Sequence, residues 1–178
     1  QEQSLIDSLE VRAQDSLFSN LPYSRSLLRN AMRQAQDSMS YYRLMGLYGK
    51  TFFISSDFDS ILYYNRPVKE YDKRAAACPR WNDVLSDVYN IEGNVWMQLN
   101  QPDSAVAYYE KSYAYRLKGE KGHLLSDICM NLADAHLHRG ELAHTASYYR
   151  RALFICDSLH LSEHSKFPVY CGLGQTYM

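Results

Sequence analysis

The chain has 178 residues and 46% of them are hydrophobic, so it can bury a core and disorder is not expected. Its 19 basic and 20 acidic residues nearly cancel, and no apolar run approaches the roughly 20 residues that cross a bilayer. We therefore expect no nucleic acid bound by this segment and no membrane contact within it. Five prolines and eight glycines lie mainly between periodic segments, which favours an all-helical chain.

Residues 1–38 predict a pair of helices. Between Ser4 and Phe18 the apolar residues recur at helical spacing. Pro22 then suits the first turn of a second helix. The apolar face of that second helix comprises Leu27, Leu28, Ala31, Met32 and Ala35.

The remainder of the chain predicts seven more helices and no strand of useful length. In chain order, we expect them over about 40–55, 57–76, 80–99, 102–118, 122–139, 141–159 and 165 to the end. Pro67 falls inside the second of these. Because an interior proline costs ~3 kcal/mol, we expect that helix to kink or end near Arg66.

The stretch from residue 93 to 112 recurs 40 residues later. The five matched pairs are Gly93 and Ala133, Trp96 and His136, Ala105 and Thr145, Tyr109 and Tyr149, and Ser112 and Ala152. A partial copy 44 residues upstream contains Gly49, Phe52 and Ile61, and one 41 residues downstream of the second copy contains Gly174 and Tyr177. Shared offsets across several positions indicate a repeated structural unit.

Small and aromatic residues at these intervals suit a pair of antiparallel helices. A small residue on the first helix lets the second approach closely, and the aromatic residue three positions later fills the gap one turn on. On the second helix, the small residue and the aromatic residue four positions later share a face. One pair cannot bury its apolar surface alone, so neighbouring pairs are expected to stack.

The pattern resembles the tetratricopeptide repeat (TPR) family, whose motif is W-x2-LG-x2-Y, then A-x3-F and A-x4-P, in a shorter period of about 34 residues. Matching positions are Tyr89, Gly93, Trp96, Ala105, Tyr109 and Ser112, then Cys129, Leu132, Ala133, His136, Thr145, Tyr149 and Ala152, then Tyr170, Leu173, Gly174 and Tyr177. The resemblance covers roughly residues 39 to 178. It implies an all-α, right-handed superhelical solenoid of antiparallel helix pairs. Its parts would be a degenerate pair (1–38), three repeats (39–78, 79–119 and 120–160) and a truncated first helix (161–178).

The last copy stops at its aromatic position. We expect the chain to be a fragment of a longer repeat protein. Leu173 and Tyr177 would then lie uncovered, which allows self-association through the truncated C-terminal helix.

No catalytic or metal-binding motif stands out. The sequence contains no GxSxG, HExxH or phosphate-binding glycine loop. His136 and His138 are two residues apart, about 200° around a helix, so they cannot share a face. The four cysteines have no CxxC spacing and are expected to be small buried apolar side chains. We predict a chain that is not an enzyme and holds no metal or cofactor; an enzyme with an unrecognised acid pair at Asp127 and Asp134 ranks last among the alternatives.

In the resembled family, a concave groove is lined by first-helix residues that face away from the packing stripe. The binding residues this implies here are Asn90, Asn94, Met97, Gln98, Asp127, Met130, Asp134 and His138, in a row that also includes Asp87 and Leu137. Asparagine amides can hold an extended peptide backbone and methionines adapt to varied side chains, although a merely solvated face is the alternative. Only Lys50 adds a positive charge to the row, so a neutral or cationic protein or peptide is the expected partner, rather than an acidic tail.

The long period, the Asp-Ser pairs at 59–60 and 103–104, and the opening SLIDSLE are similar to a bacterial group. In that group, TPR arrays precede a membrane helix and a histidine kinase or a LuxR-type DNA-binding region. The similarity implies the extracytoplasmic (periplasmic) sensor or regulatory part of a longer bacterial signalling protein. A free-standing TPR scaffold for complex assembly or secretion is the alternative function, and the cytoplasm is the alternative compartment.

Overall fold

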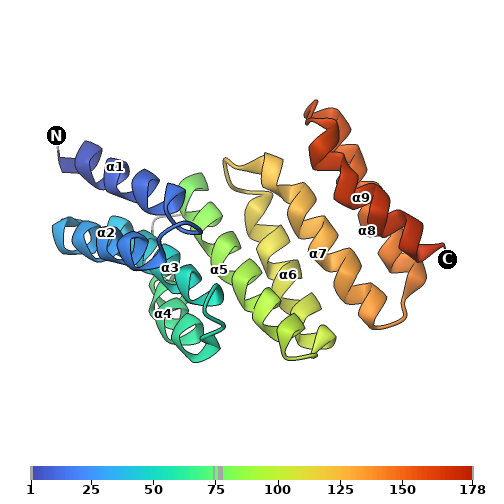
Figure 1. The fold of residues 1–178 in the computed structure, drawn as a ribbon, viewed down its shortest axis with the longest axis horizontal. Coiled ribbons are helices and arrows are strands. Elements are labelled where there is room, and N and C mark those ends of the chain that lie inside the picture. The colour runs from blue at the N-terminus through green and yellow to red at the C-terminus, as the bar shows by residue number, and fades with distance from the viewer. Residues whose placement is uncertain (1, 74, 76–77, 178) are drawn as a thin grey trace. The chain divides into compact units, whose positions relative to one another are not determined.

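The computed structural model describes all residues except 1, 74, 76–77 and 178. Within this part of the chain, every regular element is helical, as predicted (Figure 1). The elements are α1 (Glu2–Asp15), α2 (Leu21–Gln34), α3 (Ser38–Lys50), η1 (Thr51–Phe53), α4 (Phe58–Tyr71), α5 (Pro79–Gln98), α6 (Pro102–Arg116), η2 (Gly122–Leu124), α7 (Leu125–His138), α8 (Leu142–Ser158) and α9 (Glu163–Thr176). None of the described helices is both long and apolar enough to span a membrane.

The chain divides into two compact units, residues 1–77 and 78–178. In the first unit, α1 packs on α2, α2 on α3 and α3 on α4. In the second unit, α5 packs on α6, α6 on α7, α7 on α8 and α8 on α9. Each unit is therefore built from helices that pack mainly against their neighbours in the chain.

Short-range signals set where the helices begin. The carboxylate of Asp37 accepts a hydrogen bond from the backbone N–H of Ser40 at 2.8 Å, and Asp57 caps α4 in the same way through Ser60 at 3.1 Å. The bond from the Ser40 N–H holds the pKa of Asp37 below its ordinary value. Proline occupies the first turn of α2, α5 and α6, where its missing N–H costs nothing.

The expected break near Arg66 is wrong, because α4 continues through Pro67 to Tyr71. A proline at 67 removes the hydrogen bond to the carbonyl of Tyr63. Tyr63 is 63% exposed, so water can reach this turn, while Val68 on the other side is fully buried. Burial of that face keeps the helix intact despite the lost bond.

The same turn joins three helix pairs. In each copy, the carbonyl of the aromatic position accepts from the N–H five residues later: Asp57 to Phe52 at 3.0 Å, Gln101 to Trp96 at 2.9 Å, and Glu141 to His136 at 2.9 Å. The residue before each donor has a left-handed backbone, with φ of 52° at Ser56, 55° at Asn100 and 73° at Gly140. These positions are separated by the offsets of 44 and 40 found in the sequence.

The aromatic positions also pack alike. Phe52 stacks on Tyr64 with ring centroids 5.4 Å apart, and His136 stacks on Tyr148 at 5.3 Å. At the equivalent place Trp96 lies 6.1 Å from Tyr108 in a tilted arrangement. The predicted helix pairs therefore share a turn and a ring contact.

Close approach of the two helices requires the small residue on the first. A Cβ atom added to Gly93 would lie 2.4 Å from Cε1 of Tyr109. Tyr109 is 2% exposed, and Ala105 is fully buried beside it. Gly93 thus leaves room for the ring, as the spacing predicts.

The final helix, α9, packs on α8 through one face only. Val169 is fully buried, and a Cβ on Gly172 would lie 2.1 Å from Cζ of Tyr149. On the other face Tyr177 is 65% exposed and Gly174 has open space around it. Leu173 is half-buried in the cluster around Tyr149, so the expectation that it lies uncovered is wrong in part.

All four cysteines are free thiols. Cys129 and Cys156 are buried, as expected, and burial raises the pKa of Cys129 to about 12. Cys78 is half-buried, and Cys171 is exposed because it lies on the α9 face away from α8, where the expectation of burial is wrong.

Candidate functional site

The eight predicted binding residues lie on α5 and α7, and all are at least partly accessible. Gln98, Asp127, Asp134 and His138 are exposed, and Asn90, Asn94, Met97 and Met130 are half-buried. The two helices contact each other, and the side-chain amide of Asn131 donates to Oδ1 of Asn90 at 2.9 Å. The structure therefore brings the two predicted rows side by side.

Two of these residues are anchored at equivalent positions by tyrosines of the paired helix. The hydroxyl of Tyr109 donates to Oδ1 of Asn94 at 2.7 Å, and the hydroxyl of Tyr149 donates to Oδ1 of Asp134. Burial raises the pKa of both tyrosines, with the charge of Asp134 adding to the effect. Both hydroxyls therefore remain protonated donors, and each fixes one oxygen of a side chain whose remaining polar atoms can meet a partner.

The methionines serve the core as well as the surface. Met97 packs against the cluster that contains Tyr109 and Leu132, and Met130 packs against the cluster around Tyr149. The eight row residues on α5 and α7 include Asp127 and Asp134 and no lysine or arginine. Its chemistry is polar, amide-rich and weakly acidic.

A buried ion pair that no sequence motif predicts lies at the end of the α5–α6 hairpin opposite its turn. Arg116 is 2% exposed, and its Nη1 lies 2.7 Å from Oδ1 of Asp83. Its Nη2 binds Asp87, which the predicted row included. Asp83 also accepts from the backbone N–H groups of Glu120 and Lys121, at 2.9 and 3.2 Å. The carboxylate of Asp87 is therefore already bound to a buried side chain.

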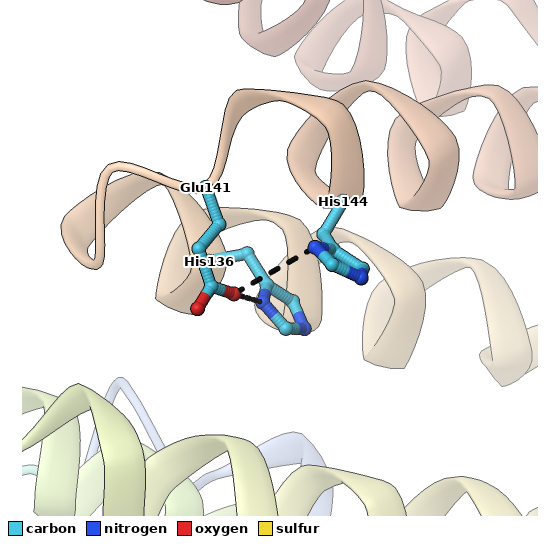
Figure 2. Close-up of side chains that lie close together, drawn as sticks. All are labelled: His136, Glu141 and His144. Atoms are coloured by element: carbon cyan, nitrogen blue, oxygen red, sulfur yellow. Dashed lines mark hydrogen bonds and ion pairs between the residues drawn. The ribbon is translucent and has the colours of Figure 1, made fainter.

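The turn between α7 and α8 brings two histidines and one glutamate together (Figure 2). Nδ1 of His136 lies 2.6 Å from Oε2 of Glu141, and Nδ1 of His144 lies 3.8 Å from the same oxygen. The two imidazoles stack with centroids 5.1 Å apart and an interplanar angle of 20°. Within the described residues, this is the group of three potential metal ligands that the fold assembles.

The glutamate of this cluster is ionised and held from both sides. The hydrogen bond with His136 lowers the pKa of Glu141, helped by the charge of Arg139. Nη2 of Arg139 lies 2.9 Å from the other oxygen, Oε1. Helical periodicity relates His136 to His138 on the same helix and does not relate it to residues across the turn. The useful signal was the spacing H-x4-E-x2-H across a turn whose copies recur at fixed offsets.

No family model and no curated protein matches this chain. Among solved structures, the chain is similar to the crystal structure of BtubC (BKLC) from P. vanneervenii. The TM-score is 0.81 at 17% sequence identity, and the match covers 99% of this chain and 73% of that chain. This likeness supports the helical fold alone.

Proposed function

We propose that the chain is a TPR-type, right-handed superhelical repeat module that binds a protein or peptide without catalysis. The binding surface is the row on α5 and α7. The observation that carries the proposal is the repeated anchoring of Asn94 and Asp134 by Tyr109 and Tyr149. Side chains held in one orientation lose little entropy when a partner binds.

The partner that fits this row is a neutral or cationic peptide. Asp127 and Asp134 are exposed, and no lysine or arginine lies among the eight row residues. Amides of Asn90 and Asn94 can pair with an extended backbone, and the half-buried methionines offer an adaptable apolar contact. An acidic tail would meet repulsion and no cationic clamp.

The test is fluorescence anisotropy with three sets of labelled peptides that are cationic, neutral or acidic. Cationic peptides should bind with the highest affinity, and added salt should weaken their binding. Asp134→Asn keeps an acceptor for Tyr149 and removes the charge, so it should weaken cationic peptides by about two- to fivefold, as expected for an exposed ion pair. Glu110→Gln removes an exposed charge on α6 and is the matched control.

Equal binding by wild type and Asp134→Asn, or tighter binding of acidic peptides, would contradict this surface. Met130→Ala is the second variant, because it should weaken neutral peptides that do not depend on the charge. Circular dichroism of each variant confirms that the helices are retained.

The setting of this activity, by the similarity noted in the sequence, is the extracytoplasmic part of a bacterial signalling protein. Protease digestion of intact cells and spheroplasts tests the compartment. Protection in both preparations would favour the cytoplasm.

A further inference from the structure

The α7–α8 turn has the composition and geometry of a three-ligand metal site. Its backbone is fixed independently of any ligand, because the N–H of Glu141 donates to the carbonyl of His136 and Gly140 adopts a positive φ of 73°. This turn places the last helical turn of α7 against the first turn of α8. His136 of α7, Glu141 of the turn and His144 of α8 therefore converge (Figure 2).

We infer that His136, Glu141 and His144 form a binding site for a zinc-class divalent metal ion. Two imidazoles and one carboxylate suit Zn²⁺, and also Ni²⁺ and Cu²⁺, better than they suit Mg²⁺ or Ca²⁺. The site lies outside the row on α5 and α7 and does not depend on peptide binding there.

The distances fit a metal with small adjustments. Zn–N and Zn–O bonds of about 2.0–2.2 Å place the ligand atoms of a tetrahedral site about 3.3–3.5 Å apart. The nitrogens of His136 and His144 lie 2.6 and 3.8 Å from Oε2 of Glu141, on either side of that spacing. All three ligand atoms lie within 4.8 Å of one another. For Nδ1 of His136 to bind the ion, the neutral imidazole takes the tautomer that carries its one ring proton on Nε2, and the ion replaces the hydrogen bond between Nδ1 and Glu141.

The surroundings hold the ligands in position. The ring of His136 stacks on the ring of Tyr148 and on that of His144, with centroid distances of 5.3 and 5.1 Å. Nη2 of Arg139 lies 2.9 Å from Oε1 of Glu141, and the other oxygen, Oε2, faces the two rings. Oδ1 of Asp103 lies 3.0 Å from Nε of Arg139, and its negative charge offsets the positive charge of Arg139.

The exposure of the three side chains leaves one side of the site open. His136 is 7% exposed, Glu141 32% and His144 65%. Water can therefore supply the remaining coordination positions, as it does in three-ligand zinc sites.

The preceding hairpin shows that the turn itself does not require these residues. Forty residues earlier the equivalent positions are Trp96, Gln101 and Ser104, and the same backbone hydrogen bond forms. The imidazoles and carboxylate are therefore an addition to the fold rather than a condition for it.

The experiment is isothermal titration of the metal-free chain with Zn²⁺ alone. We expect one strong site per chain. His144→Ala alters an exposed side chain and should weaken that site by more than about tenfold, since even outer-shell partners of a metal contribute about 10–100-fold. Glu141→Gln should do the same. His164→Ala removes an exposed histidine of α9 that lies outside both the cluster and the row on α5 and α7, and it should leave the affinity for Zn²⁺ unchanged.

Substitution with Co²⁺ separates this site from binding by cysteine. A site of two nitrogens and one oxygen gives visible ligand-field bands without intense thiolate charge-transfer absorption. Absence of binding, equal affinity in His144→Ala, loss of binding in His164→Ala, or a thiolate band would each overturn the inference. None of these outcomes bears on peptide binding by α5 and α7.

Discussion

The hairpins α5–α6 and α7–α8 have equivalent positions 40 residues apart, and their ends differ in chemistry. The open end of the first contains the buried pair of Asp83 and Arg116, and the second has His123 and Cys156 at those positions. The turn of the first contains Trp96, and the turn of the second contains the cluster around His136. Each hairpin has thus acquired a polar group at a different end.

The middle of both hairpins is conserved between the copies. Ala105 and Thr145 are fully buried, and Tyr109 and Tyr149 are nearly so. Close helix contact permits only small residues opposite these rings, so there is little freedom here. At the turns, the same backbone hydrogen bond forms in both hairpins, which leaves the side chains there free to vary.

The largest expected difference concerns the ion pair that only the first hairpin has. Arg116→Ala leaves the buried carboxylate of Asp83 without its cation, which should lower the free energy of unfolding by about 3–5 kcal/mol. Urea unfolding followed by circular dichroism measures this. Arg150→Ala, an exposed arginine of α8, is the control and should change stability by no more than about 0.5 kcal/mol. A loss for Arg116→Ala no greater than that of the control would contradict the comparison.

A second test uses glycines on α5 and α9. Gly93→Ala places a methyl group against the Tyr109 ring and should destabilise the chain by about 1–3 kcal/mol. Gly174→Ala faces open space within a helix and should stabilise it by about 0.5–1 kcal/mol. Thermal unfolding of both variants shows whether each substitution raises or lowers the stability of the chain. The same sign for both would show that packing against the second helix is not what requires Gly93.

Removal of the tyrosine hydroxyls that bind Asn94 and Asp134 should have a smaller effect on stability. Tyr109→Phe removes the hydrogen bond to Asn94 and should cost about 0.5–1.5 kcal/mol. Tyr149→Phe should cost a similar amount if the two hairpins are equivalent there. Tyr170→Phe removes a hydroxyl from a tyrosine that is 49% exposed, and it should be neutral in the same denaturation assay. A neutral Tyr109→Phe would argue against the anchoring role.

The smallest effect is a pH dependence specific to the second hairpin. The pKa of Glu141 is lowered in the folded chain, so its carboxylate stabilises the fold above the unfolded value of about 4.3. That contribution is lost as the pH falls through the lower folded pKa. Glu141→Gln introduces the residue that the first hairpin has at Gln101. The variant should have a lower free energy of unfolding than wild type at about pH 5.5, and this difference in stability should become smaller at about pH 3.

The groups that face Glu141 in this test are His136, Arg139 and His144. If the stability difference between wild type and Glu141→Gln is the same at both pH values, Glu141 stabilises the turn by packing alone.

Much of the fold could be predicted from local pattern. The shared offset of Gly93 and Ala133 indicated paired helices, and the structure places Tyr109 against Gly93. Pro67 shows where this fails: a local rule predicted a break, and burial of Val68 outweighed it. For the candidate site, the sequence predicted the accessible row but not which of its atoms are already bound to tyrosine hydroxyls.

The sequence by itself determined the helices, their pairing and the row on α5 and α7, because these follow from spacings of three and four residues within a helix. Tertiary structure alone decided the pairing of Asp83 with Arg116, 33 residues apart, and the convergence of His136, Glu141 and His144 across a turn. Helical periodicity assigns a residue to a face of its own helix. It does not report which side chain of another helix the turn will bring within hydrogen-bond distance.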